Sequence, residues 1–219
     1  MPAVKIPRKS TLVDMTAMCD VAFLLLTFFI LTSKFRPQEP VQINMPGSRA
    51  ERKIAEQNIM MLTVSKDGKL FFGVDNQKVR ARMLERMMAA YPDVAFTEAQ
   101  KLKFTTTESF GVPFQMLPAL LDGAIKNDES APGIPVDSTA SRYRRNELAD
   151  WIFAGRVADN ELRQLGEIQS EGIAVAVKGD GSTDYPKIKK VMDTLVEKKV
   201  NKFNLVTSLK GGDSVASGE

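Results

Sequence analysis

The stretch MTAMCDVAFLLLTFFILTS, residues 15–33, decides the architecture of this chain. Its residues are almost all apolar, and a helix rising about 1.5 Å per residue would carry them roughly 28 Å, close to the thickness of a bilayer core. One ionisable group, Asp20, lies near the leading end of the stretch. The sequence therefore predicts one transmembrane helix that contains a carboxylate.

A cleavable signal peptide is the main alternative to a permanent anchor. The lysines and arginine between positions 5 and 9 form a basic leader before the apolar run. The tripeptide Leu-Thr-Ser at 31–33 is a poor cleavage site, however, and a signal peptide does not favour a carboxylate at the start of its apolar core. We therefore predict an uncleaved signal anchor. The basic tail favours a cytoplasmic N-terminus and an external C-terminal part, although Lys34 and Arg36 reduce this charge bias.

Asp20 belongs to a thin polar stripe along the predicted helix. At 100° per residue, Thr16, Asp20 and Thr27 fall on one face. Asp20 lies about 8 Å along the helix from Met15, where a charge costs at least about 2.5 kcal/mol on insertion scales. Its side chain should face other helices or a water-filled path, either as a proton carrier or as a protonated carboxyl that only bonds a partner helix. Asp14, at the membrane boundary, is expected to be a helix cap or an interfacial group.

The amino-acid composition limits the functions open to the rest of the chain, outside the predicted transmembrane helix. The chain has 219 residues, of which 43% are hydrophobic and 26% charged, so it is long enough for a folded domain beside the span. A formal net charge of +3, with no aromatic-and-basic motif, argues against nucleic acid as a partner. The sequence has no histidine, no nucleophile elbow and no cluster of metal ligands, so it predicts no cofactor, no metal and no enzymatic activity. Cys19 is the single cysteine, which excludes a disulfide within the chain.

The segment after the linker predicts a hairpin and then a helix. In NIMMLTVSKDGKLFFGV, residues 58–74, two extended runs flank Asp67-Gly68, a two-residue hairpin signal. Apolar residues then recur every four positions through Met83 and Met87, which predicts an amphipathic helix over 79–91. The methionines are expected in the core and the arginines of this helix on its solvated face.

The last quarter of the chain predicts a strand, a helix and a strand. The apolar run GIAVAVK at 172–178 reads as a strand, the amphipathic stretch 186–199 as a helix, and KFNLVTSL at 202–209 as a closing strand. This order suggests a crossover unit. A phosphate-loop interpretation of KGDGS at 178–182 is disfavoured because the Gly-Lys-Ser/Thr ending is missing.

The middle of the chain, about residues 92–166, lies between the predicted helix and the predicted strand-helix-strand unit. It is rich in proline, and it predicts helices near 114–126 and 145–155. Trp151 and Phe153 are expected to pack into a small core of its own. Its role is left open between partner docking and a structural elaboration.

Three of these stretches resemble the ExbD/TolR family. In VDMTAMCDVAFLLLTFFILTS, residues 13–33, Thr16 stands at the family's threonine, and Asp20 with Val21 at its aspartate-valine pair before a leucine-rich span. Asp14 and Ala17 depart from the family's usual asparagine and proline. VQINMP at 41–46 resembles the family's short extended segment, and the stretch 176–207 its C-terminal strand, helix and strand. The resemblance covers about residues 10–90 and 167–209, so it implies that the stretch 92–166 is an insertion in the periplasmic domain.

The resemblance implies a fold and a division of the chain. It implies a single N-terminal transmembrane helix plus an α+β periplasmic domain built from a β-hairpin, a helix, the insertion and a β-α-β unit. The expected parts are a cytoplasmic tail at 1–14, the span at 15–33, a periplasmic linker at 34–57, the ExbD/TolR-like domain at 58–209 and a disordered tail at 210–219.

The resemblance also implies a function. Family members are non-enzymatic subunits of proton-driven motors in the bacterial inner membrane. A pair of their helices is held inside a ring of an ExbB-like multi-span protein, and a TonB-like transducer passes the resulting motion to outer-membrane transporters. Asp20 would then translocate protons, Thr16 and Thr27 would support it on the pore face, and the periplasmic domain would form a homodimer. Two alternatives stay open: a TolR-like motor that maintains the envelope, and an anchored periplasmic domain that binds peptidoglycan, with the helix only a tether.

Overall fold

The chain consists of two compact units, residues 1–38 and 39–219, which are considered separately. The computed structural model describes residues 15–33, 39–45, 47–48, 58–136, 146–200, 202–206 and 208–209. The predictions for Asp14, for the cytoplasmic tail and for the tail at 210–219 lie outside these residues.

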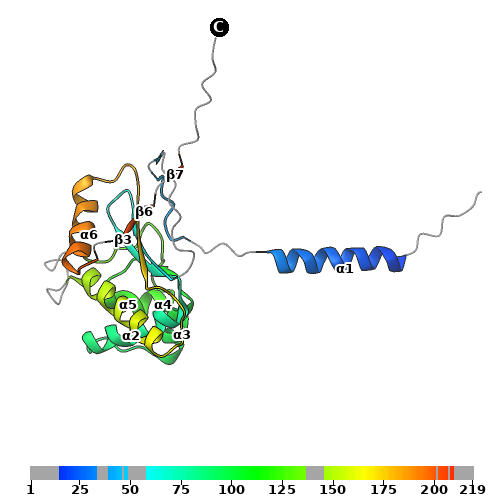
Figure 1. Cartoon of the computed structure of the whole chain (residues 1–219), viewed down its shortest axis with the longest axis horizontal. Helices are drawn as coiled ribbons and strands as arrows, with labels where there is room; N and C mark the ends of the chain where they lie inside the picture. The colour runs from blue at the N-terminus through cyan, green and yellow to red at the C-terminus, as the bar shows by residue number, and fades with distance from the viewer. Residues whose placement is uncertain are drawn as a thin grey trace, which may run out of the picture. The chain divides into compact units, whose positions relative to one another are not determined.

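The first unit contains one long helix, α1, at Met15–Thr32 (Figure 1). Apart from the half-buried Thr27 its side chains are exposed, and it has no buried residue. Among the described residues it is the one helix long and apolar enough to cross a membrane. The predicted apolar helix is therefore confirmed.

The second unit is built on a five-stranded sheet in the order β4-β3-β2-β5-β6. The strands are β2 at Ile59–Val64, β3 at Leu70–Val74, β4 at Ser109–Phe110, β5 at Ala174–Gly179 and β6 at Asn204–Val206. β3 is antiparallel to both β2 and β4, whereas β5 is parallel to both β2 and β6. The predicted hairpin and the parallel strands of the predicted β-α-β unit are both present. This mixed sheet agrees with the expected α+β fold.

The hairpin turn is one residue longer than predicted. The N–H of Ser65 donates to the carbonyl of Lys69 at 3.0 Å, which leaves three residues between them instead of two. Gly68 adopts φ +77°, the left-handed conformation that closes three-residue hairpin loops. The Asp-Gly signal thus located the turn correctly but gave the wrong loop length.

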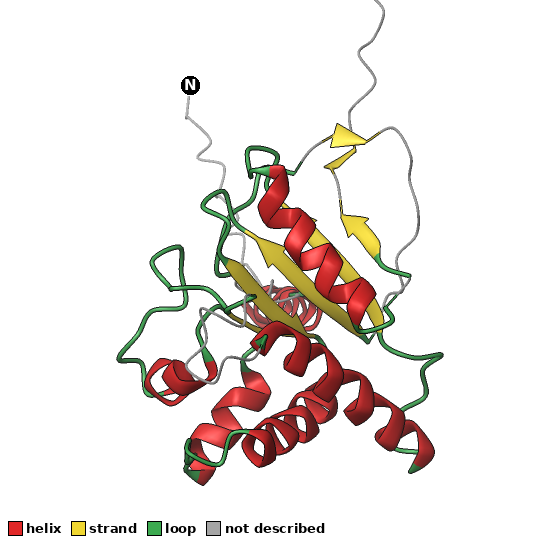
Figure 2. Cartoon of the chain, turned by 90° about the vertical axis from the view of Figure 1, so that its left-hand side faces the viewer, coloured by secondary structure: helices red, strands yellow, loops and turns green. Residues whose placement is uncertain are grey.

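Helices cover one face of the sheet (Figure 2). They are α2 at Gln77–Ala90, α3 at Glu98–Thr106, α4 at Leu117–Leu121 after a short 3-10 turn at Phe114–Met116, α5 at Glu147–Gln164 and α6 at Tyr185–Glu197. α2 and α5 pack directly against each other. Gly155 of α5 permits close packing, because a Cβ there would lie 2.6 Å from Cε of Met60 and 3.3 Å from Sδ of Met83. The alternation of buried and half-buried residues along β2 reflects this one-sided cover.

The prediction of a separate small core for residues 92–166 is wrong. Trp151 is fully buried in the main core, where its ring packs with Phe72 of the hairpin and with Phe104, Phe110 and Phe114. Phe153, its expected partner, is 61% exposed. Successive residues of a helix point about 100° apart, so Trp151 and Phe153 face opposite ways, and only Trp151 points at the sheet.

The prediction that the arginines of α2 lie on a solvated face is wrong for Arg80, which is 3% exposed. Its guanidinium donates to the carbonyl of Val74 at 2.5 Å and to the carbonyl of Thr105 at 2.9 Å. Burial lowers the pKa of Arg80, and Glu108 and Asp75 partly offset that effect. Arg80 therefore supplies donors to carbonyls at the ends of β3 and α3, which would otherwise be buried without partners.

Two elements of the middle segment, α3 and β4, have no counterpart among the predictions. A capping box at Thr97 and Gln100 starts α3: Thr97 Oγ1 accepts from the Gln100 N–H, and the Gln100 side chain accepts from the Thr97 N–H. This motif is visible in the sequence as Thr-x-x-Gln. The predicted helix near 145–155 corresponds to the longer α5, and the one near 114–126 is limited to the 3-10 turn and α4.

Of the predicted extended segment at 41–46, the described residues 41–45 pack on the end of β5. Val41 is 3% exposed in the core, and the backbone of Asn44 bonds both the Asp180 carboxylate and the Gly181 N–H, at 3.0 and 2.9 Å. A short parallel pair follows, between β1 at Gly47–Ser48 and β7 at Ser208–Leu209. The predicted closing strand thus belongs to two sheets, with β6 in the large sheet and β7 in this pair.

Candidate proton-carrying site

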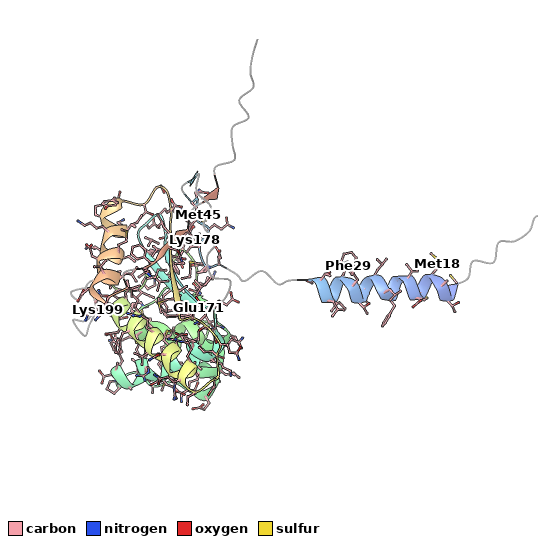
Figure 3. All side chains as sticks on the ribbon, viewed as in Figure 1. Met18, Phe29, Met45, Glu171, Lys178 and Lys199 are labelled. Carbon is pink, nitrogen blue, oxygen red and sulfur yellow. The ribbon has the colours of Figure 1, made fainter. Side chains whose placement is uncertain are left out.

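Asp20 is the one charged residue of α1. The helix has a mean hydropathy of 2.0, and Met18 and Phe29 near its two ends are among its apolar side chains (Figure 3), so in a bilayer this carboxyl would lie in an apolar segment. An ionised carboxylate at this depth is costly, whereas the protonated form is neutral. At this position Asp20 should be protonated among apolar side chains and should ionise only where its carboxyl group contacts water or a polar partner.

The helical geometry places the three predicted site residues on one face of α1. Thr16 lies four residues before Asp20 and Thr27 seven residues after it, and both spacings return to nearly the same side of a helix. The hydroxyl of Thr27 donates to the carbonyl of Leu24 at 2.9 Å. Thr32 forms the same kind of bond with the carbonyl of Phe28, at 2.7 Å. Thr27 Oγ1 can still accept a hydrogen bond, but its proton is already committed to its own helix.

A second polar group lies inside the 39–219 unit, and sequence reasoning did not find it. The Asp159 carboxylate of α5, 1% exposed, accepts from Asn58 Nδ2 at 2.5 Å, from Arg163 Nε at 3.1 Å and from the N–H of Ile173 at 3.2 Å. Asn58 Nδ2 also lies 3.0 Å from Ser170 Oγ. The sequence signal that could have revealed this cluster is an acidic residue on the apolar, inward-facing side of an amphipathic helix. Asp159 of α5 thus bonds the residues that come directly before β2 and β5, which are Asn58 and Ile173. Its evident role is structural.

No group of three or more histidine, cysteine, aspartate or glutamate side chains within the described ranges is arranged to hold a metal ion.

The description "Biopolymer transport protein ExbD/TolR" belongs to a family model that matches residues 7–210. The chain belongs to the ExbD/TolR family. No curated protein and no solved structure matches it.

Membership of the ExbD/TolR family gives α1 its context. The match spans both units and runs through the segment 92–166, whose status as an insertion stays a prediction. The family and the apolar N-terminal helix together indicate a single-pass membrane protein of a biopolymer transport system. They also imply that it works within a membrane motor complex. The ExbD/TolR chain thus carries one membrane carboxyl and one folded domain.

Proposed function

We propose that this chain is an ExbD-like subunit of a proton-channel motor in the bacterial inner membrane. Its N-terminus lies in the cytoplasm and the unit 39–219 in the periplasm. Proton passage through Asp20 drives motion that a TonB-like transducer carries to outer-membrane transport. One observation supports the proposal: in this member of the ExbD/TolR family, the apolar helix α1 contains a single charged residue, and its side chain is a carboxyl group.

The energetics suit this role. Protonation from the side of higher proton activity neutralises Asp20, so the helix can move past apolar neighbours without exposing a charge to them. Release of the proton on the other side regenerates the carboxylate. Each elementary charge that crosses about 100 mV supplies roughly 2.3 kcal/mol, so a modest number of transfers could do mechanical work.

The proposal requires partners. One carboxyl on one helix cannot form a path across a bilayer, so a ring of an ExbB-like protein must supply the rest, with two copies of this chain inside it. Thr16 and Thr27 would line the polar side of α1. Since the Thr27 hydroxyl donates to Leu24, its contribution would be limited to accepting a bond from water or from a protonated carboxyl.

Asp20→Asn tests the proposal in the protein's own host, with the chromosomal copy replaced. An asparagine cannot carry a proton, so proton-dependent outer-membrane uptake should be lost while expression and assembly of the membrane complex stay normal. Cys19→Asn is the matched control, because it places the same amide one position away and off the polar stripe; it should keep uptake. Asp20→Asn cells that keep uptake and also retain their periplasmic contents would refute the proton-carrying role.

The same strains separate the remaining alternatives. If α1 is only a tether, exchanging it for an unrelated apolar span would preserve activity. If the motor is TolR-like, Asp20→Asn would leave uptake intact and instead make the cells leak periplasmic contents.

A further inference from the structure

Two adjoining grooves lie on the 39–219 unit, between α5, the start of β5 and the segment after α6. The larger has a volume of about 500 Å³ and the smaller about 320 Å³. Arg156 and Ile173 line both, so the two form one elongated depression, here called the basic groove. Its size is in the range of sites that hold several ligand groups at once.

The lining of the basic groove is strongly cationic. Arg156, Arg163, Lys199 and Lys202 all contribute to it. The one carboxylate among the lining residues, Asp159, already accepts from Arg163 and two other donors. The groove therefore keeps an excess positive charge that a partner can neutralise.

Between the charges the groove is apolar. Phe153, which is 61% exposed, lies one helical turn before Arg156, and Val157, Ile173 and Val175 continue the apolar surface. A free inorganic anion would leave this surface in water, whereas a chain of alternating acidic and apolar side chains would cover both kinds of lining.

Lys199 gives an independent sign that the groove binds something. It follows α6 with φ +57°, and the bonds from Lys199 N–H to the Val196 carbonyl and from Val200 N–H to the Leu195 carbonyl form a Schellman cap. Glycine is the usual residue at this position because a side chain is strained there. A lysine at this position costs stability, and its cationic side chain lines the groove.

We propose that the basic groove is a docking surface for an extended acidic segment of a partner polypeptide. Its carboxylates pair with Arg156, Lys199 and Lys202, and its apolar side chains rest on Phe153 and Ile173. The inference does not depend on proton transfer by Asp20, so the two proposals can fail separately.

The test measures binding of a fluorescein-labelled peptide of alternating glutamate and valine to the full-length chain in neutral detergent, by fluorescence anisotropy. Lys199→Gly should weaken binding about two- to fivefold, the range for one partly exposed charge contact. The same substitution relieves the backbone strain, so it should raise Tm by about 2–4 °C. A loss of affinity together with a gain in stability cannot be explained by damage to the fold. Adding Lys202→Gln to Lys199→Gly should weaken binding further.

Three controls can overturn the inference. Lys189→Gln removes a lysine from the exposed side of α6 that lines neither groove, and it should not change the affinity. Equal weakening by Lys189→Gln, or equal binding of a glutamine-valine peptide, would show that the groove has no specific role. Stronger groove-dependent retention on purified peptidoglycan or on anionic lipid vesicles than on the acidic peptide would refute the assignment to a polypeptide partner.

Discussion

Asp159→Asn should destabilise the 39–219 unit far more than an ordinary surface change. The substitution preserves the shape of the side chain, and one oxygen can still accept from Asn58. An NH₂ group would, however, replace the oxygen that accepts from Arg163 at 3.1 Å and from the Ile173 N–H at 3.2 Å, so donors would face donors. Flipping the amide moves this conflict to Asn58 Nδ2, and the Asn58 amide would then have to turn as well to present its unpaired oxygen.

The expected loss follows from two charge-assisted bonds, each worth about 1.5–3 kcal/mol. Because Arg163 is about one-third exposed, its bond should count at the low end, which gives a total of roughly 3–4.5 kcal/mol. For a domain of this size that lowers Tm on the order of 10 °C.

The assay is thermal unfolding of the full-length chain in detergent, followed by tryptophan fluorescence. Trp151 is the single tryptophan, and it is packed among Phe72, Phe104, Phe110 and Phe114, so its emission reports this core. Asn160→Ala is the control, because Asn160 is the exposed neighbour and its bond to Arg163 is long, at 3.4 Å. If Asp159→Asn and Asn160→Ala melt within about 1 °C of each other, the buried bonds do not have the importance assigned to them.

Two further predictions concern buried polar contacts elsewhere in the unit. Arg80→Met should lower the free energy of unfolding by about 2–4 kcal/mol in urea titrations, because the carbonyls of Val74 and Thr105 lose their donors. Arg82→Met is the control: Arg82 lies on the exposed side of the same helix, so its substitution should have little effect. Equal effects of the two substitutions would contradict the burial argument. The pKa of Asp180 is lowered by hydrogen bonds from the hydroxyl and N–H of Ser182 and from the N–H of Asn44. Its contribution is therefore complete above the unfolded pKa of about 4 and is lost as pH falls toward the folded pKa. Asp180→Asn should flatten the decline of Tm in this acid range, and an unchanged slope would exclude Asp180 as a source of acid sensitivity.

Local patterns in the sequence were sufficient to predict most of the secondary structure. The apolar run of α1, the four-residue spacing in α2 and the alternation around Asp67-Gly68 each follow from a period that one element imposes on its own residues. The parallel partnership of β5 and β6 follows from the length of the connecting helix. These features need no knowledge of distant contacts.

Long-range packing could not be read in the same way. Charged residues on amphipathic helices usually face water, so the sequence predicts that Arg80 is exposed. In the structure Arg80 is buried and donates to carbonyls at the ends of β3 and α3. Trp151 joined the main core because α5 packs on α2, a pairing that no local period specifies. The basic groove combines residues of α5, β5 and the end of α6, so no single stretch of sequence shows it.

The chain that connects the two units indicates which residues of the 39–219 unit would be the first to bear a mechanical force applied through α1. A pull on the span would reach residues 39–44 along the chain, and an ion pair, two backbone hydrogen bonds and a buried valine hold that segment. Glu39 pairs with Lys178 at 2.5 Å but is 60% exposed, so this ion pair adds little. The Asn44 N–H bond to the Asp180 carboxylate is worth about 1.5–3 kcal/mol, and the bond from the Gly181 N–H to the Asn44 carbonyl about 1 kcal/mol. Val41, 3% exposed, buries an apolar side chain worth about 1.5–3 kcal/mol, so this valine should resist the load more than the visible salt bridge does.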